Sequence, residues 1–234
     1  MGPDAAVAGV SSDECEAVDD AWEQPQEPPE GGGQPGDPLD LDPGGCSIAE
    51  FPCSPLIFDL NGDGIHTTSV EESPVLFDLD GDGIPHPIGW TDPATEDGIL
   101  YFDHNHNGWI DGGTELFGDA TFLPDGERAR NGFEALAAYD RNGDGLITPR
   151  DAVWGKLRLW VDRNHDAIMT HDENYTLGAM HVLEISVAYS ETMLVDRAEN
   201  HHRQQSTFRQ KTGGETGNEV VTRAVHDVYF GAKP

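Results

Sequence analysis

Basic residues are missing from the first half of the chain. No lysine or arginine precedes Arg128, whereas residues 1–127 contain 29 aspartates and glutamates. Residues 128–234 contain the other 15 acidic side chains and all 13 basic ones, so the whole chain has a net charge of -31. Because the phosphates of nucleic acids and anionic membranes would meet a like-charged surface, both are poor partners. Divalent cations are the expected counter-charge.

Long apolar runs and cysteines are also scarce. No segment reaches the ~18–20 apolar residues that a membrane span needs. The start of the chain, MGPDAAVAGV, lacks the basic and apolar regions of a signal peptide. Of the three cysteines, Cys46 and Cys53 are close enough to close a small disulfide loop in an oxidising compartment, with Cys15 left over. The odd count does not decide between paired and free thiols.

Residues 1–53 are rich in proline, glycine and acidic side chains and poor in aromatic and β-branched ones. A segment of this composition cannot bury enough apolar surface to offset the entropy lost on folding. We therefore predict a disordered acidic tail over residues 1–53, which serves as a solvated linker or as an acidic interaction motif. A folded domain is predicted over residues 54–234.

From Ser54 onward, short apolar runs alternate with clusters of Asp, Asn and Gly. Five clusters occur, and each opens a 12-residue window with oxygen-bearing side chains at positions 1, 3 and 5. Their spacing is irregular, which argues against a solenoid. We number the windows in chain order: loop 1 (residues 59–70), loop 2 (78–89), loop 3 (103–114), loop 4 (140–151) and loop 5 (162–173).

Loops 4 and 5 match the pattern by which a protein loop binds calcium. Calcium takes about 6–8 oxygen ligands, which such a loop supplies from positions 1, 3, 5, 7 and 12, with a sharp turn at position 6. Position 12 is Asp151 in loop 4 and Glu173 in loop 5. Position 6 of loop 5 is Ala167 rather than glycine. A left-handed conformation there costs ~1–2 kcal/mol, which predicts a weakened site.

Loops 1–3 begin in the same way and end differently. Position 12 is Val70, Gly89 or Thr114, although loop 3 also has Asp111 at position 9 and Glu115 directly after the window. The missing ligands must come from elsewhere, and the options are the other loops, Glu71, Glu72, Asp97, Asp119 and water. The predicted cofactor is Ca²⁺, and its candidate ligands are Asp59, Asn61, Asp63, Asp78, Asp80, Asp82, Asp103, Asn105, Asn107, Asp111, Glu115, Asp140, Asn142, Asp144, Asp151, Asp162, Asn164, Asp166 and Glu173.

A single cluster of this kind also has a simpler interpretation, because Asn-Gly and Asp-Gly are ordinary turn signals. Five clusters, each followed by an apolar residue at position 7 or 8, favour calcium loops.

His104 and His106 occupy positions 2 and 4 of loop 3, where side chains usually point to solvent, so a transition-metal site there is not favoured. No nucleophile–base pair or phosphate-binding motif is recognisable, and we assign no catalytic residue.

The apolar runs predict a mixed fold. Strands are expected before loops 1, 2 and 3, and a C-terminal β-hairpin near residues 206–210 and 220–229. Capping signals at Asn131 and Thr148 predict helices on both sides of loop 4, the second burying Val153, Leu157 and Trp160. With a further capping box at Thr170, loops 4 and 5 are expected to form a helix-loop-helix EF-hand-like pair. The predicted fold class is therefore α+β.

The order of the loops and the run Glu115-Leu116-Phe117-Gly118-Asp119 resemble a bacterial domain family. The family comprises the calcium-responsive self-processing modules of RTX-type secreted proteins and their non-processing EF-hand-like relatives. The similarity extends from about Ser54 to the C-terminal hairpin. It implies a secreted or cell-surface protein, exported after removal of an upstream signal or by a C-terminal or other route.

In the processing members, the resemblance implies calcium-activated cleavage of an Asp–Pro bond just before the first loop. The matching dipeptide here is Ser54–Pro55, and serine has no carboxylate with which to attack its own peptide carbonyl. Calcium binding with calcium-dependent folding is therefore the predicted function, and self-processing is the alternative. The partners expected are calcium ions, with no nucleic acid and no membrane span. An adhesion role is neither supported nor excluded.

Overall fold

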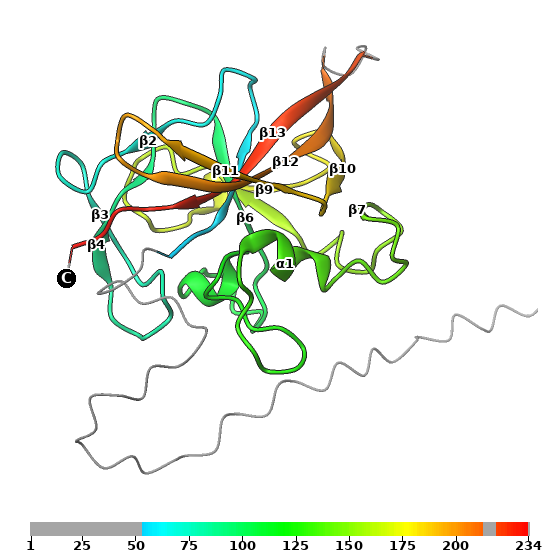
Figure 1. The fold of residues 1–234 in the computed structure, drawn as a ribbon, viewed down its shortest axis with the longest axis horizontal. Helices are drawn as coiled ribbons and strands as arrows, with labels where there is room; N and C mark the ends of the chain where they lie inside the picture. The colour runs from blue at the N-terminus through cyan, green and yellow to red at the C-terminus, as the bar shows by residue number, and fades with distance from the viewer. Residues whose placement is uncertain (1–52, 213–218, 234) are drawn as a thin grey trace, which may run out of the picture. The chain divides into compact units, whose positions relative to one another are not determined.

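The computed structural model describes residues 53–212 and 219–233, and these residues form an almost entirely β structure (Figure 1). Contacts divide the chain into Met1–Gly36 and Asp37–Pro234, and every described residue belongs to the second unit. The predicted acidic tail lies outside the described residues apart from its last position, Cys53. None of the described helices is long and apolar enough to cross a membrane.

Nine strands form one antiparallel sheet in the order β7-β10-β12-β13-β1-β6-β8-β9, with β11 paired to β12. Two small ribbons, β2-β5 and β3-β4, accompany it. The strands are β1 (Leu56–Asp59), β2 (Thr67–Thr68), β3 (Val75–Phe77), β4 (His86–Ile88), β5 (Trp90–Thr91), β6 (Asp97–Tyr101), β7 (Leu146–Ile147), β8 (Arg158–Trp160), β9 (Asn174–Thr176), β10 (Val182–Ser186), β11 (Ser190–Val195), β12 (His201–Thr212) and β13 (Glu219–Tyr229). The helical segments are α1 (Gly132–Ala137) and two 3-10 turns, η1 (Gly113–Glu115) and η2 (His171–Glu173).

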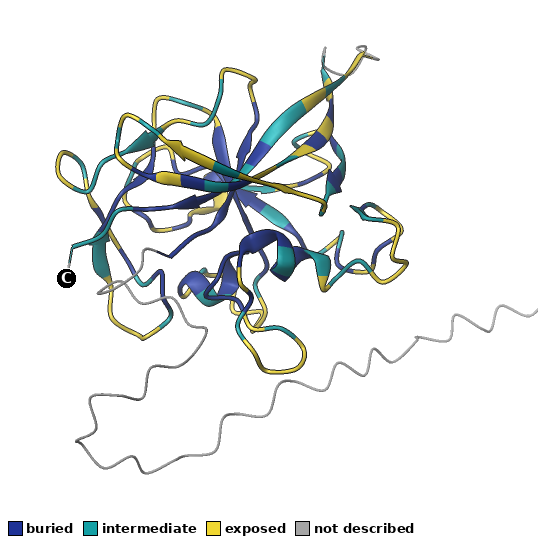
Figure 2. Ribbon diagram, in the orientation of Figure 1, coloured by how far each residue is buried: buried dark blue, intermediate teal, exposed yellow. Residues whose placement is uncertain are grey.

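The central strands of the sheet are buried on both faces (Figure 2). In β1, Leu56 and Phe58 join one hydrophobic cluster and Ile57 joins the other. In β8, Leu159 and Trp160 divide between the same two clusters. Because successive side chains of a strand point to opposite faces, the sheet is a middle layer between two cores. One core also receives α1, and the other receives the β3 and β5 segments.

The antiparallel order β1-β6-β8 decides where the loops leave the sheet. Asp59 at the end of β1 is paired with Asp97 at the start of β6, and Trp160 at the end of β8 is paired with Ile99. Loops 1 and 5, which follow β1 and β8, therefore leave the sheet at the same end of these strands. Loop 3 follows β6 and leaves at the opposite end.

The C-terminal hairpin is present and is longer than the sequence predicts. β12 and β13 pair from His201↔Tyr229 to Thr212↔Glu219, with one register shift between His202 and Gln204. The residues of its tip lie outside the described part of the chain. Because β13 also pairs with β1, the end of the chain holds the strand that leads into loop 1.

The predicted α+β class and the EF-hand-like helix pair are wrong. Among the described residues, α1 is the only α-helix, and no second helix follows loop 4. Residues 151–156 form turns instead, and Trp160 belongs to strand β8. After loop 5 the chain makes the short turn η2 and enters β9 at once.

The cause of this error is an ambiguous apolar spacing. Val153, Leu157 and Trp160 fit one face of a helix, but Leu159 and Trp160 also fit a strand buried on both faces. The strand forms because Trp160 pairs with both Ile99 and Asn174 and packs into the second core. Tertiary pairing therefore overrides the local helical signal.

Cys53 is fully buried and disulfide-bonded. The Cys46 half of the predicted pairing lies outside the described residues.

Candidate metal centre

The five loops share one hydrogen-bonded framework. In each, the backbone N–H of position 6 donates to the carboxylate of position 1, at 2.8–3.2 Å. The N–H of position 5 donates to the side chain of position 3, at 2.8–3.4 Å. Both bonds fold the loop back on itself, because the side chains of positions 1 and 3 accept from N–H groups further along the loop. The structure thus gives the five predicted loops one common conformation.

The turn at position 6 is left-handed in all five loops, as the calcium-loop pattern predicts. Ala167 adopts it with φ 54° despite its side chain. Position 4 is also left-handed in every loop, which sequence analysis did not anticipate. His106 and His165 occupy it with φ 58° and 60°, where the other loops have glycine. Loops 3 and 5 therefore hold side chains in a conformation that costs ~1–2 kcal/mol per residue.

Loops 3 and 5 are closed by a glutamate in the same way. Glu173 accepts hydrogen bonds from the N–H groups of positions 2 and 9, Arg163 and Thr170, at 3.2 and 3.1 Å. Glu115 accepts from the equivalent positions of loop 3, His104 and Asp111, at 3.2 and 2.9 Å. Glu115 stands one residue later in its loop than Glu173, and each glutamate is the last residue of a 3-10 turn, η1 or η2, so the extra residue of loop 3 precedes η1.

Asp111 faces the centre of loop 3, since the side-chain amides of Asn105 and Asn107 donate to its Oδ2 at 2.6 and 2.7 Å. Burial raises the pKa of Glu115, and the nearby negative charges of Asp111 and Asp103 add to this effect. A cation among these groups would reverse the sign of that local field. The donor set is made of oxygens, which is the set that suits calcium.

Loop 4 is closed by Asp151, whose Oδ2 accepts from the N–H of Thr148 at 2.9 Å. The side chain is buried, and its Oδ1 has no hydrogen-bond partner among the described residues. A buried carboxylate oxygen left unsatisfied is costly. This oxygen therefore fits a metal ligand, in agreement with the sequence pattern of loop 4.

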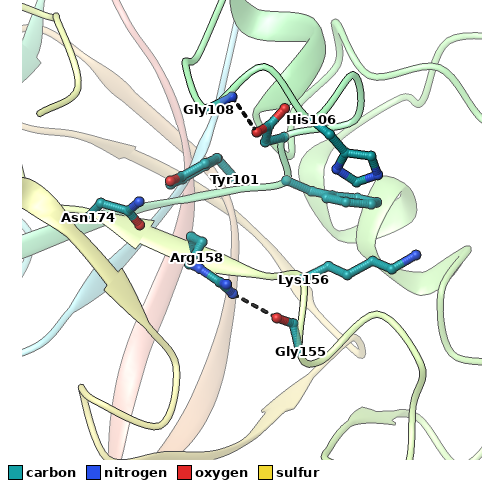
Figure 3. Close-up of a pocket in the computed structure, with 9 residues that line it drawn as sticks. Tyr101, His106, Gly108, Gly155, Lys156, Arg158 and Asn174 are labelled. Atoms are coloured by element: carbon teal, nitrogen blue, oxygen red, sulfur yellow. Dashed lines mark hydrogen bonds between the residues drawn. The ribbon is translucent and has the colours of Figure 1, made fainter. Parts of the chain in front are cut away.

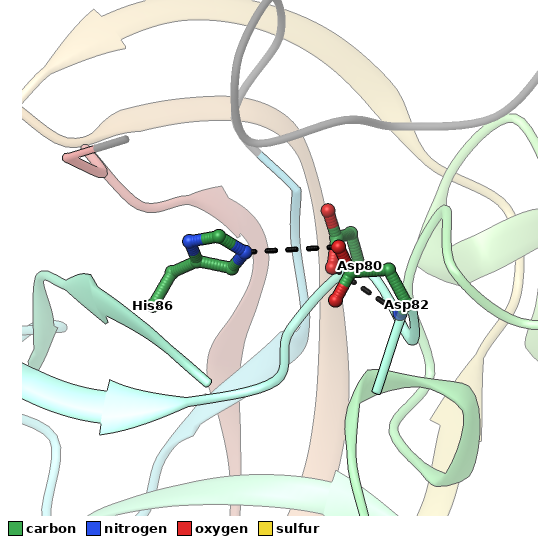
Figure 4. A group of neighbouring side chains, drawn as sticks. All are labelled: Asp80, Asp82 and His86. Atoms are coloured by element: carbon green, nitrogen blue, oxygen red, sulfur yellow. Dashed lines mark hydrogen bonds and ion pairs between the residues drawn. The ribbon is translucent and has the colours of Figure 1, made fainter. Parts of the chain in front are cut away.

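Loop 2 has no acid at its end, but it gathers a different set of groups. Ligand atoms of Asp80, Asp82 and His86 lie within 4.8 Å of one another (Figure 4). The Nε2 of His86 is 3.7 Å from Oδ2 of Asp82. Burial raises the pKa of Asp78 at position 1. His86 was missed by sequence analysis, although it stands at position 9, the position that Asp111 occupies in loop 3.

Loop 1 contains Asp59, Asn61 and Asp63 in the shared framework and Val70 at position 12. Two of the outside acids considered for it are engaged elsewhere. Glu71 pairs with Lys233 at 2.9 Å, and Asp119 accepts from the N–H of Ser54 at 3.0 Å.

A pocket of about 290 Å³ adjoins loop 3, between that loop and strands β8 and β9 (Figure 3). Lys156 and Arg158 supply positive charge to its wall, and the Nζ of Lys156 lies 5.7 Å from the centre of the Phe102 ring. Arg158 donates to the carbonyl of Gly155 at 2.8 Å. The pocket thus places basic groups behind an acidic loop, and its lining contains no serine or cysteine nucleophile.

Ser54 and Pro55 are buried directly before β1. Acidic groups surround them: Asp119 binds the Ser54 N–H, and Asp227 accepts from the N–H of Gly132 at 2.7 Å. Burial raises the pKa of Asp119 to about 6 and that of Asp227 to about 7. The Glu115–Asp119 motif therefore serves two sites, since Glu115 closes loop 3 and Asp119 contacts Ser54.

A family model for the SPM domain matches residues 56–230, which is most of the chain and nearly all of its described part. The chain belongs to the SPM domain family. The domain is similar to the iron-regulated protein FrpA of Neisseria meningitidis serogroup C, with 40% identity over 163 residues. That alignment covers 69% of this chain and 14% of FrpA, so the SPM chain spans only a small part of its relative. The expected resemblance to a bacterial RTX-type family is confirmed at this level.

Proposed function

We propose that this SPM domain binds Ca²⁺ through its acidic loops and that bound calcium stabilises its fold. The observation that carries the proposal is the repeated loop framework, in which the side chains of positions 1 and 3 accept from the N–H groups of positions 6 and 5 in all five loops. Loops 3, 4 and 5 add a buried carboxylate that bonds to the loop backbone. The ligands proposed are those predicted from the sequence, from Asp59 in loop 1 to Glu173 in loop 5.

Charge supports the same proposal. Residues 1–127 contain 29 acidic and no basic side chains, and loops 1, 2 and 3 lie in this part of the chain. Carboxylates gathered within a few ångströms repel one another, and bound divalent cations remove that repulsion. We infer that residues 54–234 are the calcium-binding domain and that residues 1–53 are an acidic linker outside it.

We further propose a secreted or cell-surface location. Loops with incomplete ligand sets belong to the class of sites with dissociation constants of roughly 10⁻⁴–10⁻³ M, which suits calcium at extracellular concentrations. At 1 mM calcium, a site with a dissociation constant of 10⁻⁴ M would stabilise the domain by ~1.4 kcal/mol. Three such sites would contribute ~4 kcal/mol, a large part of the stability of an ordinary domain.

Thermal unfolding tests the proposal. Circular dichroism of the full chain is followed in 1 mM CaCl₂, in 1 mM MgCl₂ and in EDTA. We expect the melting temperature to fall by more than 10 °C from calcium to EDTA, and magnesium to restore little of it, because magnesium demands a smaller and more regular site. Identical melting curves in the three solutions would show that calcium is not a folding partner.

Self-processing is the second candidate, because the chain resembles the self-processing modules of RTX-type proteins and Ser54–Pro55 directly precedes the part that matches the SPM domain. Ser54 lacks the carboxylate that this chemistry requires, so we expect the protein to remain intact in millimolar calcium on a denaturing gel. A fragment that begins at Pro38 or Pro43, or an adduct of higher mass, would contradict this expectation.

A further inference from the structure

We propose that Asp97, on strand β6, is the closing acidic ligand of loop 1, so that this calcium site is built from two strands rather than from one loop. The inference rests on the proposed calcium binding and adds a ligand that the loop pattern does not contain. Loop 1 itself ends in Val70, which offers no side-chain oxygen.

The register of the sheet places the two acids together. Asp59, position 1 of loop 1, is directly opposite Asp97 in the antiparallel pair β1–β6. Residues directly opposite in such a pair point to the same face, with Cβ atoms about 4.5–5.5 Å apart, and like charges there are destabilising. Both side chains are buried, with 6% and 2% of their surface exposed. A cation between them would convert this repulsion into attraction.

The hydrogen bonds of Asp97 resemble those of Asp151, which accepts from the N–H of Thr148 at position 9 of loop 4. The Oδ2 of Asp97 accepts from the N–H of His66, position 8 of loop 1, at 2.9 Å, and from the hydroxyl of Thr95 at 2.8 Å. Its Oδ1 is buried and has no hydrogen-bond partner among the described residues. Asp151 likewise binds the backbone of its loop through Oδ2 and leaves a buried Oδ1 without a described partner. In both loops one oxygen positions the carboxylate, and the other is left for a ligand.

Asp63, position 5 of loop 1, lies close to the same imidazole as Asp97. The Nδ1 of His66 lies 3.6 Å from Oδ1 of Asp63 and 3.9 Å from Oδ2 of Asp97. One ring nitrogen thus lies close to both carboxylates. A calcium ion that replaced the imidazole there would take oxygens from Asp59, Asp63 and Asp97.

A purely structural role for Asp97 is the simpler interpretation, since His66 and Thr95 both bond to Oδ2. It does not explain why Oδ1 is buried without a partner. The bonds from His66 and Thr95 need only one oxygen, which asparagine also has, so a structural role does not require the second carboxylate oxygen. The two interpretations therefore differ in what the Asp97→Asn variant does to calcium binding.

Calorimetric titration of the full chain with CaCl₂ tests the proposal. We expect Asp97→Asn to bind one ion fewer than the wild type, or to bind one ion at least tenfold more weakly. Glu96→Gln, an exposed neighbour, should match the wild type. The double variant Asp63→Asn/Asp97→Asn should lose the same single ion as either change alone. Unchanged binding by Asp97→Asn, or loss of two ions by the double variant, would overturn the proposal.

A measurement on the wild type covers the case in which Asp97→Asn does not fold. The carboxyl ¹³C resonance of Asp97 should shift on calcium addition together with that of Asp63, whereas that of Glu96 should not. A shift of Asp63 without Asp97 would also overturn the proposal. If the wild type binds no calcium at all, the proposed function itself fails, which is a distinct outcome.

Discussion

Asp227 provides a test of the buried acidic region beside Ser54 that does not depend on calcium ligands. Its side chain is fully buried, and burial raises its pKa from 3.8 to about 7, against the lowering effect of the Gly132 N–H. The folded protein therefore keeps the Asp227 proton between pH 4 and pH 7, while the unfolded chain releases it. Because the unfolded state binds fewer protons in this window, the stability of the wild type falls as pH rises.

The Asp227→Asn variant removes this ionisation while keeping an acceptor for Gly132. One pKa unit corresponds to about 1.36 kcal/mol, so the stability of Asp227→Asn relative to wild type should rise by about 2–3 kcal/mol from pH 5 to pH 7 and level off above pH 7. Urea unfolding in saturating calcium, followed by the fluorescence of the buried Trp90 and Trp160, measures the difference at each pH. Asp125→Asn, at an exposed turn, is the matched control and should show no such change. Parallel pH curves for wild type and Asp227→Asn would refute the reasoning.

Two further predictions concern a loop and the core. Glu173→Gln should weaken calcium binding at loop 5 at least tenfold, because the amide supplies one neutral oxygen in place of a carboxylate that bonds to positions 2 and 9. Asp172→Asn, at an exposed neighbour, is the control. Equal calcium affinities of the two variants in calorimetry would contradict the assignment. Phe58→Ala should destabilise the domain by about 3–5 kcal/mol in urea unfolding, with or without calcium. The reason is that Phe58 is fully buried and packs on Phe208, with ring centres 4.8 Å apart. A loss of stability below about 1 kcal/mol would mean that this core is loosely packed.

The loops were predictable from the sequence because their structure is local. A carboxylate at position 1 bonds to an N–H five residues later, and glycine or Ala167 supplies the left-handed turn, so a short window decides the conformation. The strands before loops 1–3 were predictable for a similar reason. In these segments the apolar run and the turn that ends it lie side by side in the sequence.

The rest depends on pairing between distant segments. Trp160 lies in a strand because Ile99 pairs with it, and no local pattern contains that information. Asp97 approaches loop 1 through strand register, so the sequence offered it only as one of several options. His86 approaches Asp82 through the fold of loop 2, and sequence analysis missed it. The left-handed histidines at position 4 were missed because the calcium-loop pattern specifies position 6 alone.

The pairing of Asp59 with Asp97 has a consequence for how the strands find their partners. If β1 slipped by one residue against β6, Asp97 would face the opposite core, away from Asp59. An ion bound by both carboxylates would stabilise the native register of β1 against β6 and would not stabilise a register shifted by one residue. Calcium would therefore favour correct strand pairing during folding, in addition to stabilising the folded domain.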